Sequence, residues 1–151
     1  MPNMPVSVGE GMTALAASSD VSEERVAAIC TLLEASGKVE RVDEKLMDCV
    51  TAVSGSGPAY AFVFIEALAD AAVRCGMPRD AAYVYAAQTV KGAAAAVLAG
   101  GKNPAALKDA VCSPGGTTIE GVAALKKGGF RSAVFDAVKA ACEKSAAMSK
   151  R

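Results

Sequence analysis

The stretch "AYAFVFIEALADAAVR", residues 59–74, decides the fold because it has the pattern of a helix that is apolar on nearly every side. Its charged residues, Glu66, Asp70 and Arg74, are spaced four apart and therefore form one narrow polar stripe along the helix. We expect such a helix to be buried almost all round.

A second helix of the same kind is expected at residues 81–99, where only Gln88, Thr89 and Lys91 interrupt "AAYVYAAQTVKGAAAAVLA". A chain of 151 residues with two such helices is expected to complete its core with a second copy, as an interlocked homodimer. The alternative is an ordinary buried core within one chain. Membrane insertion is disfavoured because neither stretch offers about 20 uninterrupted apolar residues.

Breaks that combine Gly or Pro with a cap residue divide the chain into elements. Residues 1–42 mix the extended segments "PVSV", "MTALAAS" and "GKVERVD" with a helix at 21–35, for which Asp20 and Glu23 are expected to form the capping box. Such a strand–helix–strand unit cannot bury both faces of its own sheet, so we expect it to be the edge of something larger. From residue 43 to 151 only helices are predicted, at 43–54, 58–75, 79–99, 103–111, 117–127 and 129–149.

Composition excludes several classes of function. The chain has no histidine, which removes Ser-His-Asp and Cys-His catalysis and most zinc sites, and no metal site is predicted. Its 16 basic and 16 acidic residues balance and form no basic run, so nucleic acid is not an expected partner. The five scattered cysteines fit reduced core residues of a cytoplasmic protein.

A glycine motif near the start, "GEGMTA" at residues 9–14, matches the G-x-G-x-x-A fingerprint of dinucleotide-binding folds. That fingerprint requires a strand that leads into the turn and a helix that leaves it. Here "MTALAAS" continues as an extended segment, so we interpret Gly9 and Gly11 as plain turn glycines.

The stretch "SPGGTTIEG", residues 113–121, is the strongest candidate for a binding site. Pro114 fixes the backbone, Gly115 and Gly116 permit close approach, and a T-x-x-E capping box is expected to start the next helix at Thr117. The first turn of a helix attracts an anion, and Ser113 and Thr118 would add hydroxyl donors. A tight turn between two helices, or a phosphate site, would use the same residues.

A second Gly-rich stretch, "SGSGPAY" at residues 54–60, poses the same question. Ser56 is expected to cap the following helix and Pro58 to occupy its first turn. Close packing of helices is the favoured interpretation, although the Tyr60 hydroxyl could face a cleft.

Four stretches together resemble the carboxy-terminal part of pyrroline-5-carboxylate reductase, in matching order and spacing: "MPNMPVSVGEGMTAL", "DCVTAVSGSGPAYAFVFIEALADAAVRCGMP", "AAQTVKGAA" and "LKDAVCSPGGTTIEGVAALKKGGFRSAVFDAV". The similarity covers essentially all of the chain. Its most specific part is "P-x-x-L-x-x-x-V-C-S-P-G-G-T-T-I", residues 104–119, which resembles the family's signature at the substrate site.

The resemblance implies a mainly α fold: a helical dimerisation domain at 43–151, like that at the carboxy terminus of 6-phosphogluconate dehydrogenase, after the last strands and helix of a Rossmann domain at 1–42. It also implies reduction of 1-pyrroline-5-carboxylate to L-proline with NADPH or NADH, by a homodimer or higher oligomer. The main nucleotide-binding domain of the family has no counterpart here, so the isolated chain is expected to be inactive. The alternative function is a non-catalytic helical module for dimerisation or carboxylate binding.

Site residues follow from the same resemblance. The turn would hold the substrate carboxylate through the backbone N–H groups of Thr117 and Thr118, with the Thr118 hydroxyl also a candidate proton donor to the ring nitrogen. The substrate-binding set is Ser113, Pro114, Gly115, Gly116, Thr117 and Thr118, and the cofactor-binding set is Met1, Pro2, Asn3 and Glu44. Some relatives have an acidic residue before the proline of "NPAALKD", where this chain has "AGGKNP", so no residue is assigned to that role.

Overall fold

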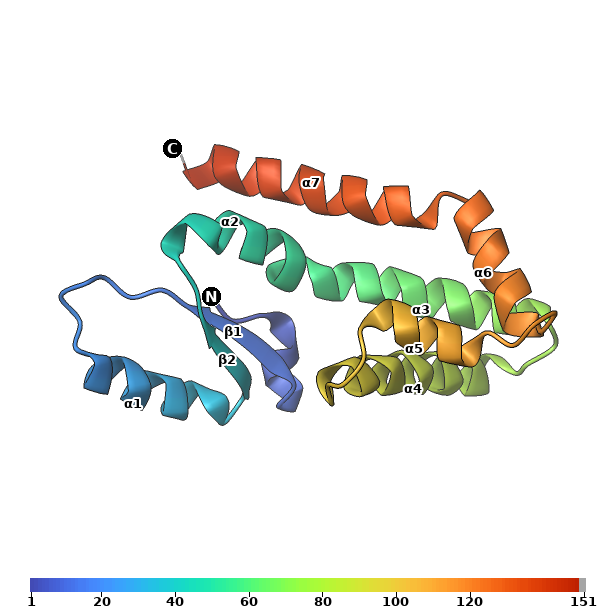
Figure 1. Cartoon of the computed structure of the whole chain (residues 1–151), viewed down its shortest axis with the longest axis horizontal. Coiled ribbons are helices and arrows are strands. Elements are labelled where there is room, and N and C mark those ends of the chain that lie inside the picture. Colours follow the sequence, from blue (N-terminus) through green and yellow to red (C-terminus); the bar gives the residue numbers. More distant parts are fainter. Residues whose placement is uncertain (150–151) are drawn as a thin grey trace. The chain divides into compact units, whose positions relative to one another are not determined.

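The computed structural model describes residues 1–149 and shows a mainly α protein with one small parallel sheet (Figure 1). The elements are η1 (Met4–Val8), β1 (Gly11–Leu15), α1 (Glu23–Glu34), β2 (Gly37–Arg41), η2 (Glu44–Leu46), α2 (Met47–Val50), η3 (Thr51–Gly55), α3 (Gly57–Arg74), α4 (Arg79–Leu98), α5 (Pro104–Val111), α6 (Thr117–Lys127) and α7 (Phe130–Ser149). The predicted fold class is confirmed.

The chain forms two compact units. Unit 1 comprises Met1–Tyr60 and the chain from Phe135 onward, and unit 2 comprises Ala61–Val134. The two units are defined by contacts within this chain. The boundary predicted at residue 42 instead separates two domains of the family that the sequence resembles. That boundary stays a prediction.

The sheet of unit 1 pairs β1 and β2 in parallel, with α1 as the connection between them. Gly11 and Gly37 are register partners at the start of the sheet, and Gly37 has φ +142°. A Cβ atom at Gly37 would lie 2.1 Å from the Gly11 carbonyl oxygen, so only glycine fits there. The extended segments predicted in "MTALAAS" and "GKVERVD" are thereby confirmed as β1 and β2.

The segment "PVSV", predicted to be extended, is instead part of the 3-10 helix η1. Pro5 fits the first turn of this helix because its ring fixes φ near the value that the turn needs. The Val6 N–H donates to the Asn3 carbonyl oxygen at 3.2 Å, and Gly9 ends the turn with φ 73°. Val6 and Val8 suggested a strand from their β propensity, but the flanking Pro5 and Gly9 set the local conformation.

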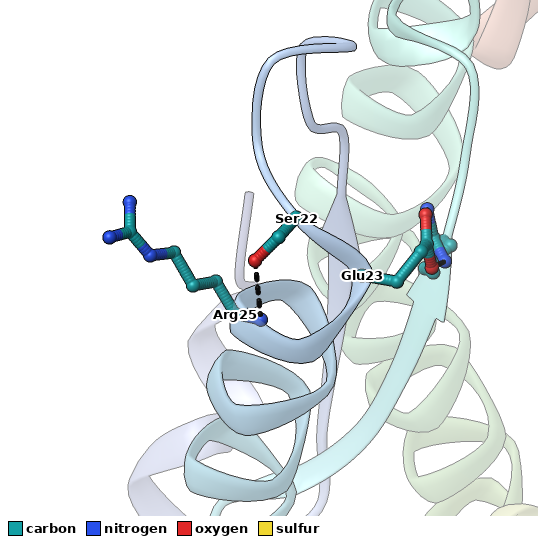
Figure 2. Close-up of polar contacts among 4 residues, drawn as sticks. Ser22, Glu23 and Arg25 are labelled. Atoms are coloured by element: carbon teal, nitrogen blue, oxygen red, sulfur yellow. Dashed lines mark hydrogen bonds and ion pairs between the residues drawn. The ribbon is translucent and has the colours of Figure 1, made fainter.

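The cap of helix α1 lies two residues later than predicted. Ser22 is the N-cap, and its Oγ accepts from the Arg25 N–H at 3.4 Å (Figure 2). The proposed Asp20–Glu23 capping box is therefore wrong. Glu23 instead pairs with Arg41 of β2, with a second oxygen 3.0 Å from Arg41 Nη2, and this contact holds the pKa of Glu23 below its ordinary value.

The predicted break at "SGSGP" does not separate two helices. Residues Glu44–Arg74 form one helical run in which Thr51–Gly55 is a π-turn (Figure 1). The Ser56 N–H donates to the Thr51 carbonyl oxygen at 2.8 Å, five residues back, and Ser56 has helical φ and ψ rather than those of a cap. The prediction that Ser56 caps a new helix is therefore wrong, and we call residues 51–55 the π-turn below.

The core of unit 2 is built from alanines where α3 and α4 pack together. Ala69, Ala82 and Ala86 are buried, with Ile65 and Met77 partly buried against them. Many large apolar side chains on these helices stay exposed within the chain: Phe62, Val63, Leu68, Tyr83, Val84, Tyr85, Val97 and Leu98. The all-round burial expected for residues 59–74 is thus not reached within one chain.

The run Glu44–Arg74 is also long and apolar enough to cross a membrane, by length and composition alone. Its most apolar window is only 11% buried within the chain. Its charged residues and the π-turn interrupt it, and the same apolar surface suits contact with another protein helix.

Within unit 1, helix α7 contacts the helical run on both sides of the π-turn, at Asp48 and at Tyr60. Ser145 Oγ donates to Asp48 Oδ1 at 2.6 Å, and the Tyr60 hydroxyl lies 3.5 Å from the Ala137 carbonyl oxygen, the long limit of a hydrogen bond. Tyr60 therefore faces α7.

Candidate functional site

Residues 113–116 form a tight turn between α5 and α6. The Gly116 N–H donates to the Ser113 carbonyl oxygen at 3.1 Å, which closes a four-residue β-turn. Pro114 occupies its second position, and Gly115 occupies its third position with φ 67°. Pro at the second position and a positive φ at the third define a type II turn, so Gly115 is there for its conformational freedom.

Gly116 has a different reason to lack a side chain. A Cβ atom there would lie 2.2 Å from Ser113 Oγ and 3.2 Å from the Ser113 carbonyl oxygen. The Ser113 hydroxyl therefore lies against the backbone that starts α6. Local geometry explains both glycines without a ligand. The features that could bind a ligand are therefore the helix terminus and the hydroxyl groups.

The start of α6 is a helix N-terminus without a side-chain cap. Gly116 is the N-cap and Thr117 is the first helical residue, so the expected Thr117–Glu120 capping box is wrong. By contrast, Ser22 caps α1 and the Asn103 side chain caps α5 by accepting from the Ala106 N–H at 2.9 Å. The first backbone N–H groups of α6 thus lack a side-chain acceptor and point out of the helix.

Three hydroxyl groups surround this terminus and are available to a ligand. Within residues 1–149, Ser113, Thr117 and Thr118 make no side-chain hydrogen bond, and Thr118 is half-buried. On the preceding helix Lys108 pairs with the carboxylate of Asp109, which raises the pKa of Lys108. An anion here would therefore be held by backbone N–H groups, hydroxyls and the helix dipole.

The residues expected at the cofactor lie in unit 1, and the first three are already engaged with the protein. Met1 exchanges both of its backbone hydrogen bonds with Ala14, at 2.8 and 3.0 Å, and Pro2 bridges to Thr13. Asn3 joins β1 to the π-turn. Glu44, by contrast, is exposed at the start of η2.

The glycine motif at residues 9–14 has the wrong structural context for a dinucleotide fingerprint. It follows the 3-10 helix η1 and leads into β1, whereas the fingerprint leads from a strand into a helix. The interpretation of Gly9 as a turn glycine is confirmed by its φ of 73°. For Gly11 it is wrong, because Gly11 is the first residue of β1 and a Cβ atom there would lie 2.3 Å from Val6 Cγ1. Within residues 1–149 no glycine-rich turn connects a strand to a following helix.

Two hollows in the described part of the chain are lined by none of residues 113–118. One, of about 360 Å³, lies between α3 and α4 in unit 2 and is mostly apolar. The other, of about 550 Å³, lies in unit 1 beside the π-turn and is lined by Thr51, Ser56, Lys144 and Ser145 among others. Sequence reasoning missed the polar surroundings of the π-turn, although a proline four residues after Ser54 was a usable signal.

Comparison with known proteins gives a consistent set of relatives. The family described as "Pyrroline-5-carboxylate reductase dimerisation" matches residues 44–148. The pyrroline-5-carboxylate reductase of Synechocystis sp. is 51% identical over 151 residues, which are all of this chain and 57% of the relative. The enzyme of that name from Escherichia coli is 50% identical over 150 residues, or 99% of this chain and 56% of the relative.

Among solved structures, the chain is similar to the Plasmodium falciparum pyrroline carboxylate reductase with NADP bound. The TM-score is 0.90 at 40% identity, covering 98% of this chain and 61% of that one. This chain therefore spans about half the length of the curated relatives that it matches.

Proposed function

Because the chain belongs to the pyrroline-5-carboxylate reductase family, we propose that it carries the substrate-binding part of an enzyme that reduces 1-pyrroline-5-carboxylate to L-proline. The observation that carries this proposal is the type II turn at residues 113–116, which leads into the uncapped start of α6. A cyclic imino acid offers one carboxylate, and this terminus offers donors for one anion.

The substrate carboxylate is bound by the backbone N–H groups of Thr117 and Thr118, which are the first two residues of α6. The hydroxyls of Ser113 and Thr118 donate to the same group, since neither has another side-chain partner among residues 1–149. Pro114 and Gly115 fix the turn, and Gly116 lets the Ser113 hydroxyl lie against the terminus. Charge-assisted bonds of this kind are stronger than bonds between neutral groups.

The chemistry does not require a strong base, which agrees with a sequence that lacks histidine. A protonated imine is already an electrophile, so the protein mainly fixes the distance and the face of attack. The bound nicotinamide cofactor, NADPH or NADH, supplies the hydride. The ring nitrogen takes the proton that makes the imine electrophilic from a water molecule or from the Thr118 hydroxyl before hydride transfer. In the second case Ser113 and the backbone N–H groups hold the carboxylate, and water returns the proton to Thr118.

The residues of this chain fit the cofactor only as a lining. Met1 and Pro2 would line its nicotinamide end with Asn3 behind them, and Glu44 would lie near it, while the dinucleotide phosphates need a glycine-rich strand-to-helix turn from another segment. Residues 1–151 produced by themselves are therefore inactive as a reductase.

The apolar faces left exposed on α3 and α4 pair with a second copy of the chain. They include Phe62, Val63, Val84 and Tyr85, and they lie within the residues that match the dimerisation family. Large apolar side chains exposed together on neighbouring helices are typical of a protein–protein interface. The homodimer acts in the cytoplasm.

The test joins residues 1–151 to the portion of the Escherichia coli relative that the chain does not match. We expect this chimera to oxidise NADPH in the presence of 1-pyrroline-5-carboxylate and to form L-proline. In parallel, L-proline added to the 151-residue chain should shift the backbone amide signals of Thr117 and Thr118 in NMR spectra.

Three outcomes would contradict the proposal. A folded, dinucleotide-binding chimera without activity would favour a non-catalytic carboxylate-binding module. Displacement of L-proline by inorganic phosphate at low concentration would favour a phosphate site. NADPH oxidation by residues 1–151 alone would overturn the proposed division of roles.

A further inference from the structure

The π-turn contains a backbone carbonyl that its own helix cannot satisfy. In a regular helix the Ser54 carbonyl oxygen would accept from the N–H of residue 58, but Pro58 has none. The next N–H, that of Ala59, donates to the Ser56 carbonyl oxygen at 3.0 Å. The Ser54 carbonyl therefore lacks its regular helical donor and can accept a hydrogen bond from another part of the chain.

Asn3 supplies that donor from a distant part of the sequence. Its Nδ2 lies 3.2 Å from the Ser54 carbonyl oxygen and 3.3 Å from Ser54 Oγ. Its Oδ1 accepts from the Met12 N–H of β1 at 2.9 Å. One carboxamide thus joins the sheet to the π-turn and uses both of its ends.

A second contact joins the same two segments. A Cβ atom at Gly55 would lie 2.8 Å from Met1 Cε, so the methionine methyl group packs directly on the π-turn backbone. Met1 and Asn3 are two residues apart and contact adjacent residues of the π-turn, Gly55 and Ser54. Residues 1–3 and the π-turn are therefore held together by one polar and one apolar contact.

We propose that Asn3 is a positioning residue whose carboxamide substitutes for the N–H that Pro58 lacks. It fixes the π-turn and residues 1–3 in one arrangement. Its consequence for catalysis rests on the proposed function, in which Met1 and Pro2 line the nicotinamide. Asn3 then acts by placing these two residues, since its own polar atoms are bonded within the protein.

The first test uses the 151-residue chain and no assumption about function. Asn3→Asp keeps the acceptor for the Met12 N–H but removes the donor to Ser54. We expect hydrogen exchange of the Ser56 amide, which closes the π-turn, to be about 5- to 30-fold faster. Ser54→Ala is the matched control, because it removes only the longer of the two bonds and should change exchange less.

The decisive comparison repeats Asn3→Asp in a Pro58→Ala background. Alanine in place of Pro58 restores an N–H that can reach the Ser54 carbonyl, so the effect of Asn3→Asp on Ser56 exchange should be largely lost. Equal acceleration in both backgrounds, or none in either, would overturn the proposal.

The catalytic consequence is measured separately in the active chimera. Asn3→Asp should lower kcat or raise KM for NADPH while KM for 1-pyrroline-5-carboxylate stays the same, and Pro58→Ala should restore much of the loss. If Asn3 only stabilised the fold, then well below the unfolding temperature Asn3→Asp would not change the parameters for NADPH while leaving KM for 1-pyrroline-5-carboxylate the same. If the unsubstituted chimera is inactive, the proposed function fails, whereas the exchange result still decides the role of Asn3 in the π-turn.

Discussion

Two short stretches rich in Ser, Gly and Pro look alike in the sequence and fold differently. "SPGG" at 113–116 is a type II turn that ends α5 and starts α6. "SGSGP" at 54–58 stays inside a continuous helical run as a π-turn. In the first stretch the surrounding hydroxyls have no protein partner among residues 1–149, and in the second the polar groups are tied to Asn3.

The position of the proline accounts for the difference. Pro114 precedes its glycines and sets the second position of a turn, so that Gly115 can take a positive φ at the third. Pro58 follows its glycines, and neither Gly55 nor Gly57 has a positive φ. There the proline only removes one helical hydrogen bond, which the π-turn and Asn3 accommodate. A turn that ends a helix therefore leaves donors for a ligand, and a turn within a helix uses them internally.

The largest effect is expected from Gly116→Ala. The new Cβ would displace the Ser113 hydroxyl, which lies 2.2 Å from that position, and would misplace it relative to the start of α6. We expect kcat/KM of the chimera for 1-pyrroline-5-carboxylate to fall about 100-fold, the usual cost of a misplacement near 1 Å. Steady-state kinetics measure the loss, and NMR checks that the fold is kept.

Gly121→Ala is the matched control on the same helix. A Cβ atom there meets nothing within 4 Å, so activity should be unchanged and stability should rise by about 0.5–1 kcal/mol. Equal loss of activity in both variants would refute the special role of residue 116.

Thr118→Val should have the next largest effect. Valine keeps the shape and removes the hydroxyl that is proposed to bind the carboxylate and reach the ring nitrogen. A lost bond to a charged group of about 1.5 kcal/mol corresponds to a roughly tenfold lower kcat/KM. Thr117→Val is the control, since only the backbone N–H of Thr117 is proposed to act, and a larger loss there would reverse the two assignments.

The sequence predicted the helices and the two strands well because their signals are local: hydrophobic spacing, caps and glycine breaks. It failed where a distant residue decides the conformation. Pro58 indicates that the Ser54 carbonyl loses its helical donor, but nothing near residues 54–58 indicates that Asn3 will satisfy this carbonyl, so the sequence predicts a break where the structure has the π-turn. It also failed where two capping residues compete, as with Asp20 and Ser22, because Asp and Ser are about equally favoured as N-cap residues.

The candidate site was partly predictable for the same reason. The turn and the start of α6 follow from "SPGGTT" alone, but the availability of the three hydroxyls depends on the rest of the chain. The cofactor residues Met1, Pro2, Asn3 and Glu44 came from a resemblance, and their role stays a proposal.

Replacing one glycine in the type II turn and one in the π-turn should show which of the two needs a backbone conformation that only glycine adopts easily. Gly115→Ala places a side chain at φ 67° and should cost about 1–2 kcal/mol of unfolding free energy. Gly55→Ala lies in helical backbone, where alanine gains about 0.5–1 kcal/mol, and this offsets the displacement of the flexible Met1 methyl group. Urea denaturation of both variants measures the difference, and a larger cost at Gly55 would mean that the π-turn is the more constrained of the two.

The smallest effect is expected at the two helix starts that flank the type II turn. Asn103→Ala removes the side chain that caps α5 and should cost about 1 kcal/mol of unfolding free energy. Thr117→Ala should lower the unfolding free energy by only a few tenths of a kcal/mol, because Thr117 is the first residue of α6 and does not cap it. Thermal unfolding resolves this difference as a few degrees in Tm for a chain of this size. If the two substitutions cost the same, Thr117 does act as a cap, the first N–H groups of α6 are already satisfied by it, and the carboxylate would have to bind elsewhere.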